Sequence, residues 1–224
     1  MAMSATSTPQ AWNGGSAAAR LDDRIEPRQA SAVFLDKDGT LIHDVPYNVD
    51  PDRITLLPGV GASLRGLQDA GFLLFVVSNQ PGVALNRFPA SALCMVEARI
   101  DELLAEFGVV ISGYAWCPHP PAGTRGTSIA CTCRKPRPGL ILDTATTHGV
   151  ALDRSWMVGD ILDDIEAGNR AGCRTILVDR GNETRWRAGK VRTPNAIVYQ
   201  FPDAARFILD GMRPRADRPH VAPG

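Results

Sequence analysis

Short apolar runs alternate with longer amphipathic segments through the middle of the chain. The run FLLFVVS at 72–78 is one of them, and the segments 32–36 and 156–159 are two more. Runs of this length without an alternating polar face are typical of strands that are buried on both sides of a sheet. On this basis we predict strands at 32–36, 72–78, 113–117, 156–159, 175–179 and 196–199.

The segments between these strands carry apolar residues at helical spacing. Within 90–107, Leu93, Val96, Ile100 and Leu104 recur every three or four residues, as on one face of an amphipathic helix. We predict helices at 58–70, 90–107, 138–148, 163–171 and 202–209. The alternation predicts an α/β fold in which a doubly wound, mostly parallel sheet lies between two layers of helices.

The two ends of the chain lack this alternation. Residues 1–29 contain an alanine run, a Gly-Gly pair and scattered charges, and residues 212–224 are rich in Pro and Arg. Segments without hydrophobic periodicity are typical of disordered chain. We therefore expect a disordered leader at 1–29, one globular domain at 30–211 and a disordered tail at 212–224.

The composition is ordinary for a globular protein and argues against several classes of function. Of the 224 residues, 44% are hydrophobic and 21% are charged, and the formal net charge is zero. A neutral chain has no basic surplus for binding nucleic acid or an anionic membrane. No apolar run approaches the roughly 20 residues that cross a bilayer, and the first residues do not resemble a secretory signal. We expect a cytoplasmic protein that binds neither nucleic acid nor membranes.

Acidic side chains follow two of the predicted strands. Asp36 and Asp38 come after the first strand and precede Gly39-Thr40, and Asp160 ends the fourth strand. In a doubly wound sheet these two strands are neighbours where the strand order reverses, which is where such sheets bind ligands. Carboxylate and carbonyl oxygens, completed by water and phosphate, suit Mg²⁺. A simple turn is the alternative for Asp36 and Asp38, because Asp and Gly both favour turns.

Two further segments carry groups that can bind phosphate. Ser78 ends the second strand, where a hydroxyl and backbone amides can hold a phosphoryl oxygen, although a polar turn would look the same. Arg134 and Lys135 lie between the third strand and the next helix, where a lysine would neutralise phosphate charge unless the loop is merely solvated. Asp163 begins a predicted helix and fits the role of a cap or dipole partner.

Four soft or borderline metal ligands lie close together in the sequence. They form two pairs, Cys117-x-His119 and Cys131-x-Cys133, which are separated by a loop rich in Pro, Gly and Thr. In a chain without a signal peptide, such a cluster favours a metal over disulfides. Three thiolates and one imidazole make a closed tetrahedral zinc site, which is structural because no coordination position stays open. Zinc would hold the loop 117–133 and position the basic pair that follows it.

Taken in order, these residues resemble the signature of the haloacid dehalogenase (HAD) superfamily of phosphotransferases. The matching elements are Asp-x-Asp-Gly-Thr at 36–40, Ser78, Lys135 and Gly-Asp-x-x-x-Asp at 159–164. The pattern Cys-Pro-His with Cys-x-Cys-Arg-Lys-Pro is similar to that of two capless families, the D-glycero-D-manno-heptose-1,7-bisphosphate 7-phosphatases and the histidinol-phosphatases. The resemblance implies a Rossmann-like HAD fold without a large cap domain.

The resemblance also implies a Mg²⁺-dependent phosphoric monoester hydrolase that works through an aspartyl-phosphate. Asp36 would be the nucleophile and Asp38 the general acid and base. Asp36, the Asp38 carbonyl and Asp160 would hold Mg²⁺. Ser78 and Lys135 would stabilise the transferred phosphoryl group. Behind these ligands, Asp164 would support the site, with Asp163 as the weaker candidate for that role.

The implied substrate is a small sugar bisphosphate, first of all the heptose bisphosphate, with histidinol phosphate as the nearest alternative. Asn79, Arg134, Asp44 and Tyr47 would bind the part of the substrate that does not react. The sequence favours two other functions less. A phosphatase of nucleic-acid ends would need a basic surplus, and a zinc-stabilised binding module would not need the complete catalytic set. We expect a monomer.

Three features depart from the pattern of the heptose phosphatases. The segment after Ser78 reads Asn-Gln-Pro-Gly-Val-Ala-Leu-Asn-Arg, which displaces the basic residue to Arg87. Ile161 follows Asp160 where many members carry lysine, and the zinc loop has its own length and content, including Arg125. All three lie where the non-reacting end of a substrate is expected, so they bear on substrate choice more than on the reaction.

Overall fold

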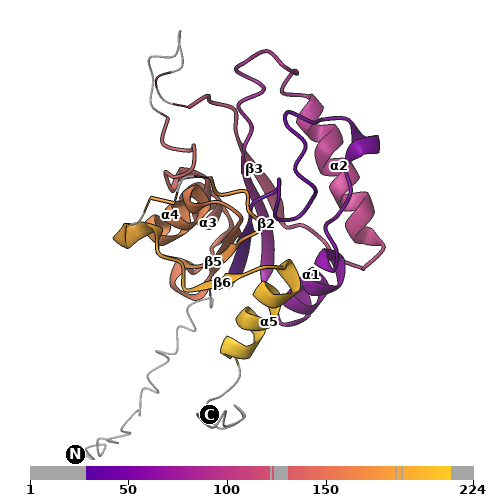
Figure 1. Ribbon diagram of the computed structural model, residues 1–224. Helices are drawn as coiled ribbons and strands as arrows, with labels where there is room; N and C mark the ends of the chain where they lie inside the picture. Colours follow the sequence, from indigo (N-terminus) through magenta and orange to yellow (C-terminus); the bar gives the residue numbers. More distant parts are fainter. Residues whose placement is uncertain (1–28, 122, 124–130, 185, 188, 213–224) are drawn as a thin grey trace, which may run out of the picture.

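Six parallel strands form the centre of the part of the chain that the structure describes (Figure 1). The strands are β1 (Ala32–Leu35), β2 (Leu73–Asn79), β3 (Gly113–Cys117), β4 (Trp156–Gly159), β5 (Arg174–Val178) and β6 (Ala196–Val198). They lie in the order β3-β2-β1-β4-β5-β6, and every neighbouring pair is parallel. The predicted doubly wound parallel sheet is confirmed, and each predicted strand is present to within one residue at either end.

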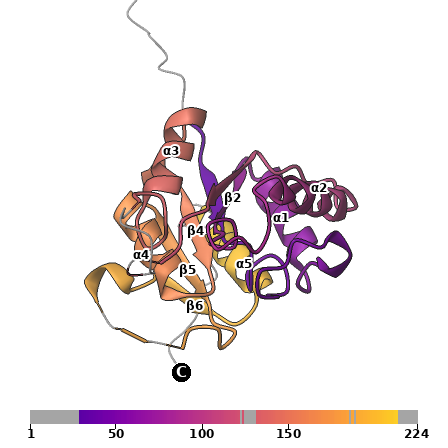
Figure 2. The ribbon, with the colours of Figure 1, turned by 90° about the horizontal axis from the view of Figure 1, so that it is seen from above.

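Helices cover both faces of the sheet (Figure 2). On one face lie α1 (Val60–Asp69), α2 (Ala92–Ala105) and α5 (Phe201–Met212), and on the other lie α3 (Gly139–His148) and α4 (Leu162–Ala171). The side chains of β1 alternate between the two cores, with Val33 and Leu35 in the first and Ala32 and Phe34 in the second. All four are fully buried, which explains the continuous apolar run of this strand. The predicted three layers are therefore confirmed.

The helix ends differ from the predicted ones by up to three residues. α1 begins at Val60 instead of at 58, because Gly59 has a φ of 76°, a left-handed conformation that a right-handed helix cannot include. Short 3₁₀ turns at Pro51–Arg53, Leu152–Arg154 and Lys190–Arg192 were not predicted. Three residues are too few to show a hydrophobic period, so the sequence pattern carries no signal for them.

The structure is a computed structural model that describes residues 29–121, 123, 131–184, 186–187 and 189–212. Apart from Gln29 and Met212, the predicted leader and tail lie outside the described residues, as does Arg125 of the zinc loop. Above the carboxyl ends of the strands, the described segments are loops and a 3₁₀ turn, with no large cap domain among them (Figure 1). No helix within the described residues has the length and apolar character needed to cross a membrane.

The chain reverses its direction across the sheet between β1 and β4. It runs from β1 to β2 and β3 on one side, and then crosses to β4 on the other side of β1. Leu35 is paired with Val158, and the Asp36 N–H donates to the Val158 carbonyl at 2.9 Å. Asp36 therefore lies beside Gly159 and Asp160, at the edge where doubly wound sheets bind their ligands.

A buried hydroxyl joins the amino ends of β1 and β4. Ser155 is fully buried, and its Oγ accepts a hydrogen bond from the Ala32 N–H at 2.9 Å. The same hydroxyl donates to the Ala151 carbonyl at 2.6 Å. Because β1 and β4 both carry site residues at their far ends, this contact helps to fix their relative register.

Ser155→Ala should lower the free energy of unfolding by about 1–3 kcal/mol, because it leaves the Ala32 N–H buried without a partner. Chemical denaturation followed by circular dichroism measures this change. Ser91→Ala is the matched control, since it removes an exposed hydroxyl that caps no helical N–H, and it should change stability by less than about 0.5 kcal/mol. Equal effects of the two variants would contradict the role given to Ser155.

Candidate active site

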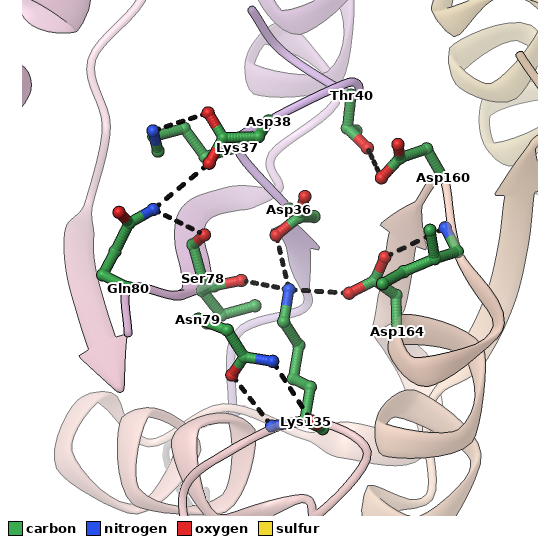
Figure 3. A network of polar contacts seen from close by, with 12 residues as sticks. Asp36, Lys37, Asp38, Thr40, Ser78, Asn79, Gln80, Lys135, Asp160 and Asp164 are labelled. Carbon is green, nitrogen blue, oxygen red and sulfur yellow. Dashed lines mark hydrogen bonds and ion pairs between the residues drawn. The ribbon is translucent and has the colours of Figure 1, made fainter. Parts of the chain in front are cut away.

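Three carboxyl groups converge at the carboxyl ends of β1 and β4 (Figure 3). Asp36 follows β1, Asp160 follows β4 and Asp164 lies in the first turn of α4. Each has an oxygen within 4.8 Å of an oxygen of the other two, and all three residues are buried. Gly159 makes this approach possible, because a Cβ at that position would overlap the side chain of Asp164. The strand order thus brings together carboxylates more than a hundred residues apart in the sequence.

The ammonium group of Lys135 lies between two of these carboxylates (Figure 3). Its Nζ is 2.5 Å from Asp36 Oδ1 and 2.6 Å from Asp164 Oδ1, and it donates to the Val77 carbonyl at 2.8 Å. The lysine is only 2% exposed. Burial alone would lower the pKa of Lys135, but the charges of Asp164 and Asp36 outweigh it and raise that pKa, so the group is a permanent cation.

Asn79 fixes the backbone of Lys135. The Asn79 Nδ2 donates to the Lys135 carbonyl at 3.1 Å, and the Lys135 N–H donates to Asn79 Oδ1 at 3.0 Å. Both ends of the Asn79 amide are engaged by this neighbouring loop, and the substrate contact that the sequence predicts for Asn79 stays a prediction. Asn79 therefore acts on the site by holding the lysine in place.

Asp160 is held from two sides. Thr40 Oγ1 lies 3.4 Å from Oδ1, and Asn182 Nδ2 donates to Oδ2 at 2.6 Å. Burial, followed by the charge of Asp36, raises the pKa of Asp160 to about 8. Burial likewise raises the pKa of Asp164 to about 7, although Lys135 acts in the opposite direction. Without a metal ion, Asp160 therefore holds a proton near neutral pH, and Asp164, which lies beside the Lys135 ammonium, loses its proton at a lower pH.

Asp38 lies on the other side of Asp36 and points toward a separate polar cluster (Figure 3). Its Oδ1 is 2.7 Å from Lys37 Nζ, and its Oδ2 accepts from Gln80 Nε2 at 3.2 Å. The same amide nitrogen donates to Ser78 Oγ at 3.2 Å. Burial is the main cause that raises the pKa of Asp38, with Asp36 contributing in the same direction. A raised pKa suits a carboxyl group that must give and take a proton near neutral pH.

The remaining predicted site residues lie around this centre. Arg134 donates from Nη1 to the His119 carbonyl at 3.0 Å, so it is held on the zinc loop. Asp44 is exposed but close enough to contribute to the raised pKa of Asp38. Tyr47 is 49% exposed, and the Arg87 guanidinium lies 5.6 Å from its ring centroid. Asp163 is not part of the carboxylate cluster, because it pairs with Arg192 at 3.0 Å.

The four predicted zinc ligands form a second cluster, in which all four ligand atoms lie within 4.8 Å of one another. The Sγ of Cys117 lies 3.5 Å from His119 Nδ1, 3.8 Å from Cys131 Sγ and 3.2 Å from Cys133 Sγ. His119 Nδ1 lies 3.2 Å from the sulfur of Cys133. Ligands placed about 2.3 Å from a central zinc ion would be about 3.8 Å apart, so the observed spacing is slightly tighter than a loaded site requires. The donor set of three thiols and one imidazole fits zinc.

Four polar residues at the centre were not predicted as site residues: Lys37, Thr40, Gln80 and Asn182. Thr40 and Gln80 lie within segments that the sequence already singled out. Asn182 lies after β5, where no motif marks it, and only its position beyond the carboxyl end of a neighbouring strand could have drawn attention to it.

The charge balance of the centre favours a hard cation. Asp36, Asp160 and Asp164 can carry three negative charges, whereas Lys135 supplies one positive charge. Carboxylate oxygens at this spacing are the ligands that Mg²⁺ prefers. Among the described residues, the donor set therefore fits a magnesium ion beside the lysine.

Comparison with known proteins adds a family context. Residues 132–204 match the model of the HAD-hydrolase-like family. The chain is 40% identical over 182 residues to a D-glycero-β-D-manno-heptose-1,7-bisphosphate 7-phosphatase of Haemophilus ducreyi, covering 81% of this chain and 93% of the relative. It is 33% identical over 195 residues to the protein of the same name from Escherichia coli K12, covering 87% and 94%.

A solved structure shows a similar fold. It is the crystal structure of a D,D-heptose 1,7-bisphosphate phosphatase from B. bronchiseptica, complexed with magnesium and phosphate. The TM-score is 0.70 at 29% sequence identity, and the match covers 81% of this chain and 99% of the other. The likeness therefore extends over the whole of that protein.

The magnesium-free protein should lose stability as the pH rises from about 4 to about 8. In the folded state the pKa of Asp160 is about 8 and that of Asp164 about 7, against 3.8 for an ordinary Asp. Between these values the folded state holds protons that the unfolded state releases, so the free energy of unfolding falls with rising pH. Chemical denaturation in magnesium-free buffer at several pH values measures the slope.

Asp160→Asn is the informative variant, because an amide keeps the shape of the side chain and does not titrate. Its free energy of unfolding should depend less steeply on pH than that of the parent over the same window. Parallel pH dependences of the two proteins would contradict the assignment.

Proposed function

Because this chain belongs to the family of D-glycero-β-D-manno-heptose-1,7-bisphosphate 7-phosphatases, we propose that it is a magnesium-dependent phosphatase of a small sugar bisphosphate. The proposed substrate is D-glycero-D-manno-heptose 1,7-bisphosphate, which would lose its 7-phosphate. One observation carries the proposal: a buried lysine joins the carboxylate after β1 to the carboxylate cluster after β4. This arrangement suits a phosphoryl group that must be attacked by one carboxylate while its charge is neutralised.

The first step would form an aspartyl-phosphate on Asp36. Lys135 holds Oδ1 of this carboxylate, which leaves the other oxygen for in-line attack on phosphorus. As the new oxygen–phosphorus bond forms, the bond from phosphorus to the sugar oxygen breaks. Asp38 would protonate that departing oxygen, and its raised pKa favours the protonated form needed for this task.

The second step would hydrolyse the aspartyl-phosphate. Asp38, now a carboxylate, would accept a proton from a water molecule that attacks phosphorus. The bond between phosphorus and the Asp36 oxygen then breaks, which releases inorganic phosphate and restores both carboxyl groups. Gln80 and Lys37 keep Asp38 in place through both steps, because they contact its two oxygens.

Asp36, Asp160 and the Asp38 carbonyl would hold the magnesium ion, with Asp164 supporting them through Lys135. When bound, Mg²⁺ offsets the charge of the phosphate against the incoming carboxylate. Lys135 and Ser78 would bind phosphoryl oxygens beside it. The lysine is suited to this because the Asn79 amide fixes its backbone and two carboxylates fix its ammonium.

The non-reacting part of the substrate would meet Arg134, Asp44 and Tyr47. Tyr47 has a φ of 55°, which is strained for a bulky residue, and strain of this kind gathers at ligand clamps. Its ring lies against Arg87, the basic residue displaced from the family pattern. We place Arg87 with this group, as a cation at the rim for the second phosphate.

Zinc would hold the loop that delivers Lys135. Cys133 precedes the lysine by two residues, and the Cys131 sulfur accepts from the Arg134 N–H at 3.4 Å. A closed zinc site would therefore fix the backbone immediately before the lysine.

The proposal also includes expectations about the domain, the oligomeric state and the location of the enzyme. Residues 30–211 would form the catalytic domain, and the enzyme would act as a monomer in the cytoplasm on a small soluble substrate. The net charge of zero supports a substrate other than nucleic acid.

Asp36→Asn should abolish turnover of heptose 1,7-bisphosphate, with a loss of about 10³-fold or more, because an amide cannot form the covalent intermediate. Phosphate release in the presence of Mg²⁺ measures it. Asp143→Asn is the matched control, an exposed carboxylate on α3, and it should keep the parent rate.

The same assay tests the substrate. The parent kcat/KM for the heptose bisphosphate should exceed that for histidinol phosphate and simple phosphoesters by about 100-fold. Similar low rates on all of them would refute the substrate while leaving the reaction in place. Survival of activity in Asp36→Asn would refute the nucleophile.

Metal analysis of the purified protein should find zinc at about one ion per chain. Cys131→Ser should lower both zinc retention and activity, because Lys135 follows the cluster so closely. Cys94→Ser, an exposed cysteine on α2, is the matched control and should change neither. A zinc-free protein that is fully folded and active would contradict the zinc proposal.

A further inference from the structure

The carboxylate of Asp160 receives its shorter hydrogen bond from a segment outside all the motifs that predicted the site. Asn182 Nδ2 donates to Asp160 Oδ2 at 2.6 Å, whereas the Thr40 hydroxyl lies 3.4 Å from Oδ1. Asn182 belongs to the connection between β5 and β6. The short hydrogen bond to Oδ2 fixes the rotation of the carboxylate, whereas the longer contact from Thr40 leaves Oδ1 able to take a second partner.

The connection that carries Asn182 is anchored on α4. We call the described residues of this connection, 179–184, 186–187 and 189–195, the β5–β6 strap. Its anchors are the Leu162 N–H donating to Glu183 Oε2 at 2.8 Å, Asn169 Nδ2 donating to the Val191 and Thr193 carbonyls at 3.0 Å, and Arg192 pairing with Glu166 at 2.6 Å. α4 also carries Asp164, so the strap and the carboxylate cluster share one support. The Glu183 contact ties the residue next to Asn182 directly to α4, whereas the contacts of Asn169 and Arg192 hold the far end of the strap.

The loop after β1 passes directly over the hydrogen bond between Asn182 and Asp160. Gly39 has a φ of 76°, and a Cβ there would overlap both Asp160 Oδ2 and Asn182 Nδ2. Only glycine leaves room for the amide to reach the carboxylate. The ends of β1, β4 and β5 thus meet at this one contact.

The packing of the strap depends little on the Asn182 side chain. The residue is exposed, so water can satisfy its amide, whereas its partner Asp160 is only 5% exposed. Truncating an exposed side chain changes stability little unless it leaves a buried group unpaired. The contact therefore matters for Asp160 far more than for the packing of the strap.

We propose that Asn182 is a positioning residue for the metal-binding carboxylate, holding Oδ2 of Asp160 so that its other oxygen faces the magnesium ion. This inference rests on the proposed function, in which Asp160 is a magnesium ligand. Partners that orient a metal ligand in this way commonly account for a 10–100-fold effect on metal affinity, here about tenfold for one neutral amide.

Titration calorimetry of the full chain with Mg²⁺, without substrate, tests the proposal. Asn182→Ala should raise the dissociation constant for Mg²⁺ about tenfold. In the phosphatase assay, the Mg²⁺ concentration for half-maximal velocity should rise by the same factor, while kcat at saturating Mg²⁺ returns to about the parent value. Asn182→Gln keeps the amide and should recover part of the lost affinity.

Asn169→Ala is the matched control. It removes two hydrogen bonds that anchor the strap and one that Thr175 Oγ1 of β5 donates, but it leaves the contact between Asn182 and Asp160 in place, so Mg²⁺ affinity should stay within about twofold of the parent value. Equal weakening in Asn169→Ala would overturn the proposal, because the packing of the strap would then be responsible. Unchanged Mg²⁺ affinity in Asn182→Ala, with or without a higher KM for substrate, would overturn it as well.

Failure of the proposed function would look different. A parent protein that binds Mg²⁺ but releases no phosphate from any sugar bisphosphate would refute the phosphatase, and the calorimetric comparison of the variants would still decide the role of Asn182.

Discussion

The charged ammonium group of Lys135 is almost completely buried, and two neighbouring carboxylates compensate for its lost hydration. An unpaired ammonium in such a place would cost several kcal/mol, on the order of the stability of a whole domain. Asp36 and Asp164 provide the pairing, so β1, α4 and the loop before α3 must come together at a fixed separation. Removing either partner would leave an uncompensated buried charge. The lysine therefore imposes on the fold the same geometry that phosphoryl transfer would require.

Two kinds of segment build the site. Asp36 and Asp160, which are proposed for the reaction, directly follow strand ends, and Lys135 lies on a loop but is buried against them. The groups proposed for the substrate lie on longer loops, as with Tyr47 and Arg87. Exposed loops tolerate substitution better than buried strand ends. The departure that displaces the basic residue to Arg87 lies on one of these loops, which fits a substrate preference that changes while the reaction stays the same.

The sequence predicted the sheet because β1 and its neighbours are buried on both faces and so lack polar positions. It also predicted the meeting of Asp36 with Asp160, since the strand order of doubly wound sheets follows a general rule. It could not show that the Asn79 amide would bind the backbone of Lys135, a contact between the end of β2 and a loop 56 residues further along the chain. The sequence also contained no indication of the role of Asn182. A single hydrogen bond across the edge of a sheet produces no periodic pattern, motif spacing or compositional bias that could be recognised.

The central contacts join residues from position 36 to position 182, and none of them is local. β4 has to pair with β1 before Asp160 lies near Asp36, and β5 has to be in place before Asn182 arrives. During synthesis on the ribosome, the first 150 or so residues would hold Asp36 and Lys135 without the carboxylates that follow β4. The proposed site could not assemble until β4, α4 and the segment after β5 had all emerged.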